Sequence, residues 1–130
     1  MTDSKYLLDT SAWIGFLQDE SDELKELLLS EDSVLLTSAL SFYEITKKFN
    51  KRGISERRIK KSLGQIRENC ETVQLSGELC EKAAGEAIKY GLHAIDALIY
   101  RSALENDAVL VTMDYDFEKL PGVRIVKQSR

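Results

Sequence analysis

Residues 6–9 read Tyr6-Leu7-Leu8-Asp9, an apolar run that ends in an acid. Two more continuously apolar runs lie at residues 34–36 and 109–111, and further strand-like stretches lie at 72–74 and 123–126. Continuous apolar runs of this length are typical of parallel strands that are buried on both faces. Helical patterns fill the intervals, at residues 11–18, 22–30, 41–51, 55–69, 76–90 and 94–105. The alternation predicts an α/β sandwich with a mainly parallel sheet.

Length and composition fit a single domain that spans residues 1–130. Apolar residues make up 43% of the chain, no apolar run approaches the roughly 20 residues of a membrane span, and the first residues do not resemble a signal peptide. We therefore expect a cytoplasmic protein. Cys70 and Cys80 form no C-x-x-C pair and His93 is the one histidine, which argues against a zinc site. We expect both thiols to be buried and reduced.

Net charge is −4, which argues mildly against a nucleic-acid partner. The distribution of charge argues the other way, because residues 47–61 carry eight basic side chains and a single acid, Glu56. A local field matters more to a polyanion than the charge of the whole chain. We expect Lys47, Lys48, Lys51 and Arg52 to bind the substrate. The alternative is a pair of helices whose basic faces are simply solvated.

Four acids occupy positions at which sites form in this architecture. Asp9 and Asp114 each follow a predicted strand, and ligands gather beyond the carboxyl ends of parallel strands. Asp96 lies among apolar neighbours near the start of a helix, and Glu44 lies in the first turns of the helix after the second strand. A doubly wound sheet brings all four to one edge.

Clustered carboxylates raise one another's pKa and resist joint ionisation, so the cluster needs a cation. Magnesium or manganese suits oxygen ligands, and we assign Asp9, Asp96 and Asp114 to metal binding and all four acids to catalysis. A cation at such a site activates water and clamps phosphate oxygens, which is the chemistry of phosphodiester hydrolysis. An aspartyl phosphatase is a weaker alternative, because its nucleophile usually belongs to a D-x-D arrangement.

Each acid also has a purely structural interpretation. Glu44 follows Ser41 by three positions, which is the spacing of a capping box. Asp9 is a possible helix cap, and Asp96 is a favourable charge near a helix N-terminus. After the strand at 109–111, Asp114 lies nearer the strand end, whereas Asp116 suits the N-cap of a short helical turn.

The same acids stand in motifs that resemble those of PIN-domain nucleases. The motifs are LLDTSAWI at residues 7–14, SFYEI at 41–45, HAIDALIY at 93–100 and VLVTMDYDF at 109–117. They contain Asp9, Glu44, Asp96 and Asp114 in the family's order, and they span nearly the whole chain. Size and motif style look most like the VapC-type toxins of prokaryotic toxin–antitoxin pairs.

The resemblance implies a three-layer sandwich around a parallel five-stranded sheet and a magnesium- or manganese-dependent endoribonuclease. It also implies a homodimer and an antitoxin partner, and it assigns Ser11 and Thr112 to hydroxyl positions that support the acids. Asp116 joins these supporting residues. Apolar residues of one helix, Phe42, Tyr43, Ile45 and Phe49, exceed the needs of one core and suggest self-association. Two alternatives remain: a PIN nuclease of RNA processing, or a catalytically silent module that binds RNA or protein.

Overall fold

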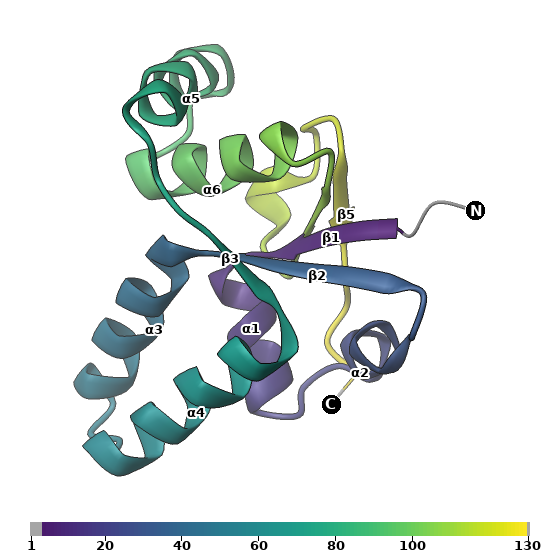
Figure 1. Ribbon diagram of the computed structural model, residues 1–130, viewed down its shortest axis with the longest axis vertical. Helices are drawn as coiled ribbons and strands as arrows, with labels where there is room; N and C mark the ends of the chain where they lie inside the picture. The colour runs from purple at the N-terminus through teal and green to yellow at the C-terminus, as the bar shows by residue number, and fades with distance from the viewer. Residues whose placement is uncertain (1–3, 130) are drawn as a thin grey trace.

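The computed structural model describes residues 4–129, which contain a five-stranded sheet with every neighbouring pair of strands parallel. The strands are β1 (Ser4–Leu8), β2 (Ser33–Ser38), β3 (Glu71–Val73), β4 (Val109–Thr112) and β5 (Val123–Ile125), in the order β3-β2-β1-β4-β5 (Figure 1). Leu8 pairs with Thr37 on one side and with Val111 on the other. The carboxyl ends of the three central strands therefore meet at one edge, and the predicted fold class is confirmed.

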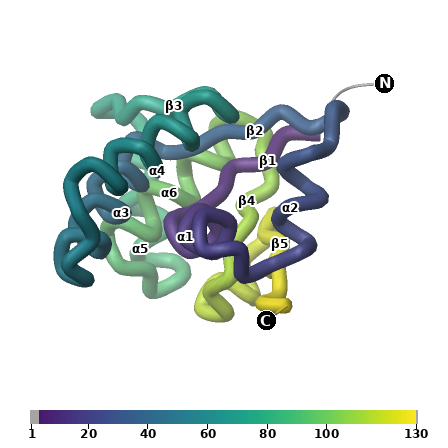
Figure 2. Tube along the Cα trace, turned by 90° about the horizontal axis from the view of Figure 1, so that it is seen from below, coloured from purple at the N-terminus to yellow at the C-terminus, as the bar shows by residue number. Residues whose placement is uncertain are grey.

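Helices cover both faces of this sheet. They are α1 (Thr10–Leu17), α2 (Asp22–Leu29), α3 (Ala39–Lys51), α4 (Glu56–Asn69), α5 (Gly77–Tyr90) and α6 (Ala94–Glu105), and a 3-10 turn, η1 (Tyr115–Phe117), follows β4. The first four helices lie on one side of the sheet, and α6 lies on the other side with α5 outside it (Figures 1 and 2). Among the described residues, no helix is long and apolar enough to cross a membrane.

Successive residues of the central strands point to opposite faces, which explains why these strands are apolar throughout. Leu8 and Val111 pack into the core beneath α1 and α3. Leu7 and Leu110 pack into the core beneath α6. These four strand residues are thus buried on one side of the sheet or the other, and Trp13 fills the first core.

Serine side chains begin four of the helices, because a serine hydroxyl accepts a hydrogen bond from a free backbone N–H of the first turn. The caps are Ser21, Ser38, Ser55 and Ser76. The capping-box interpretation of Ser41 and Glu44 is wrong, because α3 begins at Ala39 with Ser38 as its cap. Glu44 lies inside the helix, so capping does not account for its presence.

Two other expectations need correction. Cys80 is exposed on α5 rather than buried, whereas Cys70 is partly buried and its thiol donates to the Ile66 carbonyl. Ile45 and Phe49 of α3 belong to the core, so they offer no surface for self-association. Phe42 is also partly covered, since the Arg67 guanidinium carbon lies 4.6 Å from the centre of its ring. Of the four apolar residues expected to be surplus on this helix, Tyr43 alone is exposed.

Candidate active site

A small hollow of about 60 Å³ opens at the edge where the central strands end. Its lining residues come from the end of β1, the start of α1, one face of α3, the start of α6 and the segment after β4. They are Asp9, Thr10, Ser11, Glu44, Lys48, Asp96, Ile99 and Asp114. All four acids singled out in the sequence line this hollow, which we call the acidic pocket.

Asp9 is the most deeply placed acid, with 5% of its surface exposed. It caps α1, and its Oδ1 accepts hydrogen bonds from the Ala12 backbone N–H at 2.9 Å and from the Ser11 hydroxyl at 2.7 Å. Burial raises the pKa of Asp9 to about 6 even though these donors and Thr112 oppose the shift, and the charge of Asp114 raises it further. The cap and the buried charge are therefore two properties of the same residue.

Two hydroxyls join the end of β1 to the segment after β4. Thr112 donates to Asp9 Oδ2 at 2.5 Å, and the Ser11 and Thr112 hydroxyl oxygens lie 3.2 Å apart. The Ser11 hydroxyl accepts from the Met113 backbone N–H at 3.0 Å, and the Thr112 hydroxyl accepts from that of Asp114 at 3.0 Å. Ser11 and Thr112 thus orient one carboxylate and fix the backbone that carries another.

Glu44 reaches the acidic pocket from α3. Its Oε1 accepts a hydrogen bond from the Thr10 hydroxyl at 2.5 Å, and that hydroxyl lies 3.2 Å from the hydroxyl of buried Ser41. The contact joins α3 to the first residue of α1. Because Thr10 directly follows Asp9, the two acids are held by neighbouring residues of one chain segment.

Asp96 stands in the first turn of α6, three residues after the N-cap His93. Desolvation raises the pKa of Asp96, and the charges of Glu44 and Asp114 raise it further, while His93 opposes the shift. No side chain among residues 4–129 donates a hydrogen bond to Asp96. Its two oxygens are therefore free to bind a cation or a water.

Asp114 caps the η1 turn, since its Oδ1 accepts from the Asp116 backbone N–H at 2.9 Å. The expectation that Asp116 serves as the N-cap is therefore wrong by two residues. Asp116 lies within the turn, is exposed and does not line the acidic pocket. Its charge nevertheless helps to raise the pKa of Asp96.

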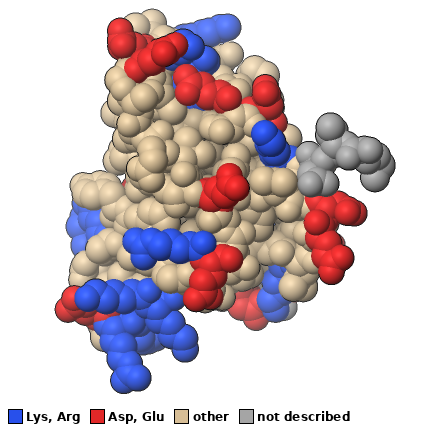
Figure 3. Space-filling view, in the orientation of Figure 1, with Lys and Arg blue, Asp and Glu red and all other residues tan. Residues whose placement is uncertain are grey.

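Basic side chains border the acidic pocket along α3. Lys48 lines it directly, and an adjoining hollow of about 170 Å³ is lined by Tyr43, Glu44, Lys47, Lys48, Lys51 and Ile95. Figure 3 shows Lys and Arg gathered over the part of the molecule that α3 and α4 form. Arg52 caps the far end of α3 and lines neither hollow. Its guanidinium instead lies 3.0 Å from the Gln18 side-chain amide.

The donor set of the acidic pocket fits a hard divalent cation. Its carboxylate oxygens converge, and burial and mutual repulsion raise the pKa of Asp9 and Asp96, which a cation reverses. Within residues 4–129, no three Asp, Glu, His or Cys side chains are placed so that together they could hold a metal ion. Magnesium does not need three such ligands, because it takes one or two carboxylates and keeps several waters.

Comparison with known proteins agrees with this geometry. Residues 6–123 match the family model of the PIN domain. The chain belongs to the PIN-domain family. No curated protein matches its sequence.

Solved structures share this PIN fold at low sequence identity. A toxin–antitoxin complex from Klebsiella pneumoniae superposes with a TM-score of 0.75 and 23% identity, over 95% of this chain and 98% of the other. VapBC2 from Rickettsia felis, bound to a DNA fragment from its promoter, superposes with a TM-score of 0.75 and 19% identity, over 95% of this chain and 99% of the other. Mycobacterium tuberculosis VapC20, described as a sarcin–ricin loop cleaving toxin, superposes with a TM-score of 0.74 and 19% identity, over 94% of this chain and 99% of the other.

Sequence reasoning missed one polar residue of the PIN site. Thr10 lines the acidic pocket and holds Glu44, although the sequence alone did not assign this role to it. The contact joins residues 34 positions apart, so no local pattern predicts it. The only local signal for this role is weak: a hydroxyl side chain directly follows the acid at the end of a strand.

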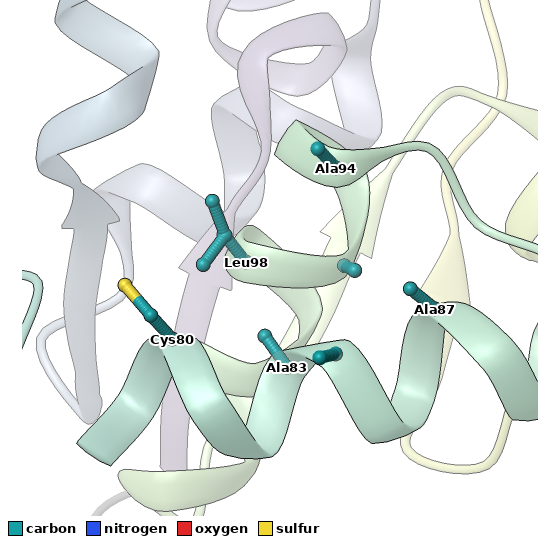
Figure 4. Close-up of a pocket in the computed structure, with 7 residues that line it drawn as sticks. Cys80, Ala83, Ala87, Ala94 and Leu98 are labelled. Atoms are coloured by element: carbon teal, nitrogen blue, oxygen red, sulfur yellow. The ribbon is translucent and has the colours of Figure 1, made fainter. Parts of the chain in front are cut away.

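A larger apolar hollow of about 340 Å³ lies elsewhere in this PIN domain, between α5 and α6 (Figure 4). Its lining residues are Cys80, Ala83, Ala84, Ala87, Ala94, Ala97 and Leu98. Apart from the Cys80 thiol, these side chains carry no ionisable group. The hollow therefore offers a single thiol and no cluster of groups for acid–base or metal chemistry, and the acidic pocket is the candidate active site.

Proposed function

We propose that the chain is a magnesium- or manganese-dependent endoribonuclease that hydrolyses RNA phosphodiester bonds. The observation that carries the proposal is the convergence of Asp9, Glu44, Asp96 and Asp114 on one hollow in a PIN domain. Neither a cysteine nor a histidine lines that hollow. A metal-assisted attack by water is therefore the reaction that these side chains support. The choice of RNA over DNA rests on the family resemblance.

Each side chain has a specific task in this proposal. Asp9, Asp96 and Asp114 would hold the cation, one or two of them directly and the others through the waters that the cation keeps. When bound, the cation activates water and neutralises charge on the phosphate. Glu44, oriented by Thr10, positions the attacking water by accepting its hydrogen bond. Ser11 and Thr112 keep Asp9 in one orientation. The remaining groups act on the substrate.

Lysines supply the positive charge for that substrate. Among the described residues that line the acidic pocket, Lys48 alone is a cation, so its ammonium group is suited to the scissile phosphate. Lys47 and Lys51 border the adjoining hollow and attract neighbouring phosphates. Arg52 contributes to the field at longer range from the end of α3. Asp116 tunes the pocket through its charge rather than by contact.

We further propose that this nuclease is the toxin of a toxin–antitoxin pair, that it is inhibited by a partner antitoxin, and that it acts as a homodimer. Structures from Klebsiella pneumoniae and Rickettsia felis that share its fold are complexes of this kind. Expression should arrest the growth of a bacterial host, and Glu44→Gln should relieve the arrest. Growth arrest that Glu44→Gln leaves unchanged would contradict a toxic role for the acidic pocket.

The test of the nuclease is cleavage of an end-labelled RNA in manganese and in EDTA. Asp96→Asn and Glu44→Gln should each lower the rate by more than about a hundredfold, as removal of a charge-stabilising group often does. Asp32→Asn is the matched control, because Asp32 is an exposed acid outside the pocket. Cleavage that persists in EDTA, or in both pocket variants, would exclude the proposal. A DNA strand of the same sequence tests the choice of RNA.

A further inference from the structure

The hollow that adjoins the acidic pocket joins an aromatic ring to three lysines. It is lined by Tyr43, Glu44, Lys47, Lys48, Lys51 and Ile95, and we call it the α3 hollow. Glu44 and Lys48 line both the α3 hollow and the acidic pocket, so the two are contiguous. An RNA strand with one phosphate in the acidic pocket would therefore have its next nucleotide over Tyr43.

Tyr43 is available for contact with a ligand. More than half of its surface is exposed, at 55%, although a tyrosine ring gains free energy when it is covered. The Lys47 ammonium lies 5.8 Å from the ring centre, which leaves the opposite face of the ring uncovered by that lysine. Ile95, at the start of α6, supplies apolar surface on the other side of the hollow.

The lysines of the α3 hollow have no carboxylate partner in the part of the chain that the structure describes. Within residues 4–129, no acid lies within 4.0 Å of the ammonium groups of Lys47, Lys48 or Lys51. Lys60 on the neighbouring helix differs, because it pairs with Glu56 at 3.2 Å. Unpaired cations beside an exposed aromatic ring match the two parts of a nucleotide, its phosphate and its base.

We propose that the α3 hollow binds one unstacked nucleotide of single-stranded RNA next to the scissile phosphate. The Tyr43 ring stacks on the base, Ile95 covers the edge of the base, and Lys47 and Lys51 hold the phosphate. This rests on the proposed function, because the acidic pocket has to be where the adjoining phosphate lies. A base inside a duplex cannot be stacked in this way, so the nuclease selects single-stranded or flexible RNA. At about 170 Å³, the hollow is smaller than the clefts of roughly 300–1,000 Å³ that enclose drug-sized ligands, which suits a single base.

The test measures binding in EDTA, so its result does not depend on cleavage. A short labelled oligoadenylate is compared with a strand of equal length and charge that lacks every base. Wild-type protein should bind the oligoadenylate about 5- to 150-fold more tightly, which is the range that base–aromatic stacking supports. Tyr43→Leu should remove this preference, and Tyr43→Trp should keep it. If Tyr43→Leu keeps the preference, or the wild type has none, the proposal is wrong, whether or not the chain cleaves RNA.

Two matched controls locate the effect. Tyr115 is exposed to a similar degree, at 58%, and also stands beside a pocket acid, but it lines neither hollow. Tyr115→Leu should therefore leave the base preference unchanged, and an equal loss in both tyrosine variants would overturn the proposal.

Replacing Lys47 and Lys51 with glutamine should lower the salt slope of binding, whereas the same change at Lys60 and Lys61 should not. Polyglutamate serves as a probe for an acidic protein partner. If replacing Lys47 and Lys51 weakens the binding of polyglutamate and the protein shows no preference for bases, the α3 hollow is a contact for a protein, and the proposal of a nucleotide site is wrong.

Discussion

The Thr112 hydroxyl donates a 2.5 Å hydrogen bond to Asp9 Oδ2, and this bond joins the ends of the adjacent strands β1 and β4. Thr112 is fully buried and Asp9 nearly so, which strengthens a bond to a carboxylate. The same hydroxyl accepts from the Asp114 backbone N–H. One threonine therefore sets the relative positions of two of the four acids, and its loss should affect both stability and cleavage.

Thr112→Val keeps the shape of the side chain but removes the hydroxyl. The Asp9 carboxylate loses a donor and the Asp114 N–H loses an acceptor, so we expect a loss of about 1–3 kcal/mol in the free energy of unfolding. Cleavage should fall more than tenfold because Asp9 is no longer held. Thr112→Ser, which retains the hydroxyl, should restore most of the activity. Urea unfolding and RNA cleavage test this, and a fully active Thr112→Val would show that the bond does not position the acids.

Stability of the metal-free protein should depend on pH in an unusual direction. The pKa of Asp9 is raised from 3.8 to about 6 in the folded protein, so between these values the folded state binds more protons than the unfolded state. The free energy of unfolding in EDTA should therefore fall as the pH rises from about 4 to 6. At 1.36 kcal/mol per pKa unit, the loss is on the order of 3 kcal/mol.

Asp9→Asn should flatten this dependence, although it also changes the cap of α1, and Asp32→Asn should leave it intact. Asp96, whose pKa is also raised, adds a contribution of the same sign. Urea unfolding at a series of pH values in EDTA measures the effect. A wild-type stability that rises through the same window would mean that Asp9 is not desolvated in the folded protein.

Manganese should reverse this loss of folding stability at higher pH. A cation neutralises the carboxylates, and protons compete with it for the same oxygens, so its effect should be larger above pH 6 than near pH 4. At about a hundred times the dissociation constant, a bound ligand adds about 2.7 kcal/mol, which raises the melting temperature of a domain this size by several degrees. A thermal melt that millimolar manganese does not move would favour a catalytically silent module.

The sequence predicted the sheet because its signal is local. Runs such as Leu7-Leu8 and residues 109–111 are apolar on both faces, and the helices between the strands allow the strands to run parallel. The convergence of Asp9 and Asp114 followed from topology, since Asp9 directly follows β1 and Asp114 comes two residues after β4, which pairs with β1. The position of Glu44 was harder to interpret. Ser41 forms a false capping box with it, and the true cap, Ser38, belongs to the preceding strand.

Contacts between distant residues were beyond sequence reasoning. The Thr10–Glu44 bond depends on the angle between α1 and α3, which no pattern in one chain reveals. The cap of η1 was misplaced because Asp114 and Asp116 are the same residue type two positions apart, so only the backbone decides between them. Burial was overestimated for Cys80, whose side chain belongs to neither core.

Self-association is expected on a face other than α3. Ile88 on α5 is 86% exposed and follows Ala87, which lines the apolar hollow between α5 and α6. Two copies related by a twofold axis would cover this surface, and such dimers are the commonest homo-oligomers.

Light scattering at micromolar concentration should give a particle larger than 14.7 kDa. Ile88→Glu should shift it to the monomer, whereas Leu29→Glu, at an equally exposed residue of α2, should not. A wild-type monomer would refute the homodimer.

Asp114 and Asp116 provide the sharpest test of the fourth acid. Asp114 lines the acidic pocket and caps η1, whereas Asp116 is exposed and contributes its backbone N–H to that cap. Asparagine also caps well, so Asp114→Asn should cost less than about 1 kcal/mol of stability and keep the fold. We expect the same substitution to lower cleavage by more than about a hundredfold, because the charge that would hold the cation is gone.

Asp116→Asn should leave the turn intact, since its backbone N–H still donates to Asp114, and should change cleavage by only a few fold. The small effect arises because Asp116 acts on the pocket through charge alone. Both variants are compared in RNA cleavage and in thermal melts. An inactive Asp116→Asn beside an active Asp114→Asn would move the fourth acid by two residues and leave the nuclease intact. Full activity in both would remove the η1 segment from the mechanism, and the acidic pocket would then have to work with Asp9, Glu44 and Asp96 alone.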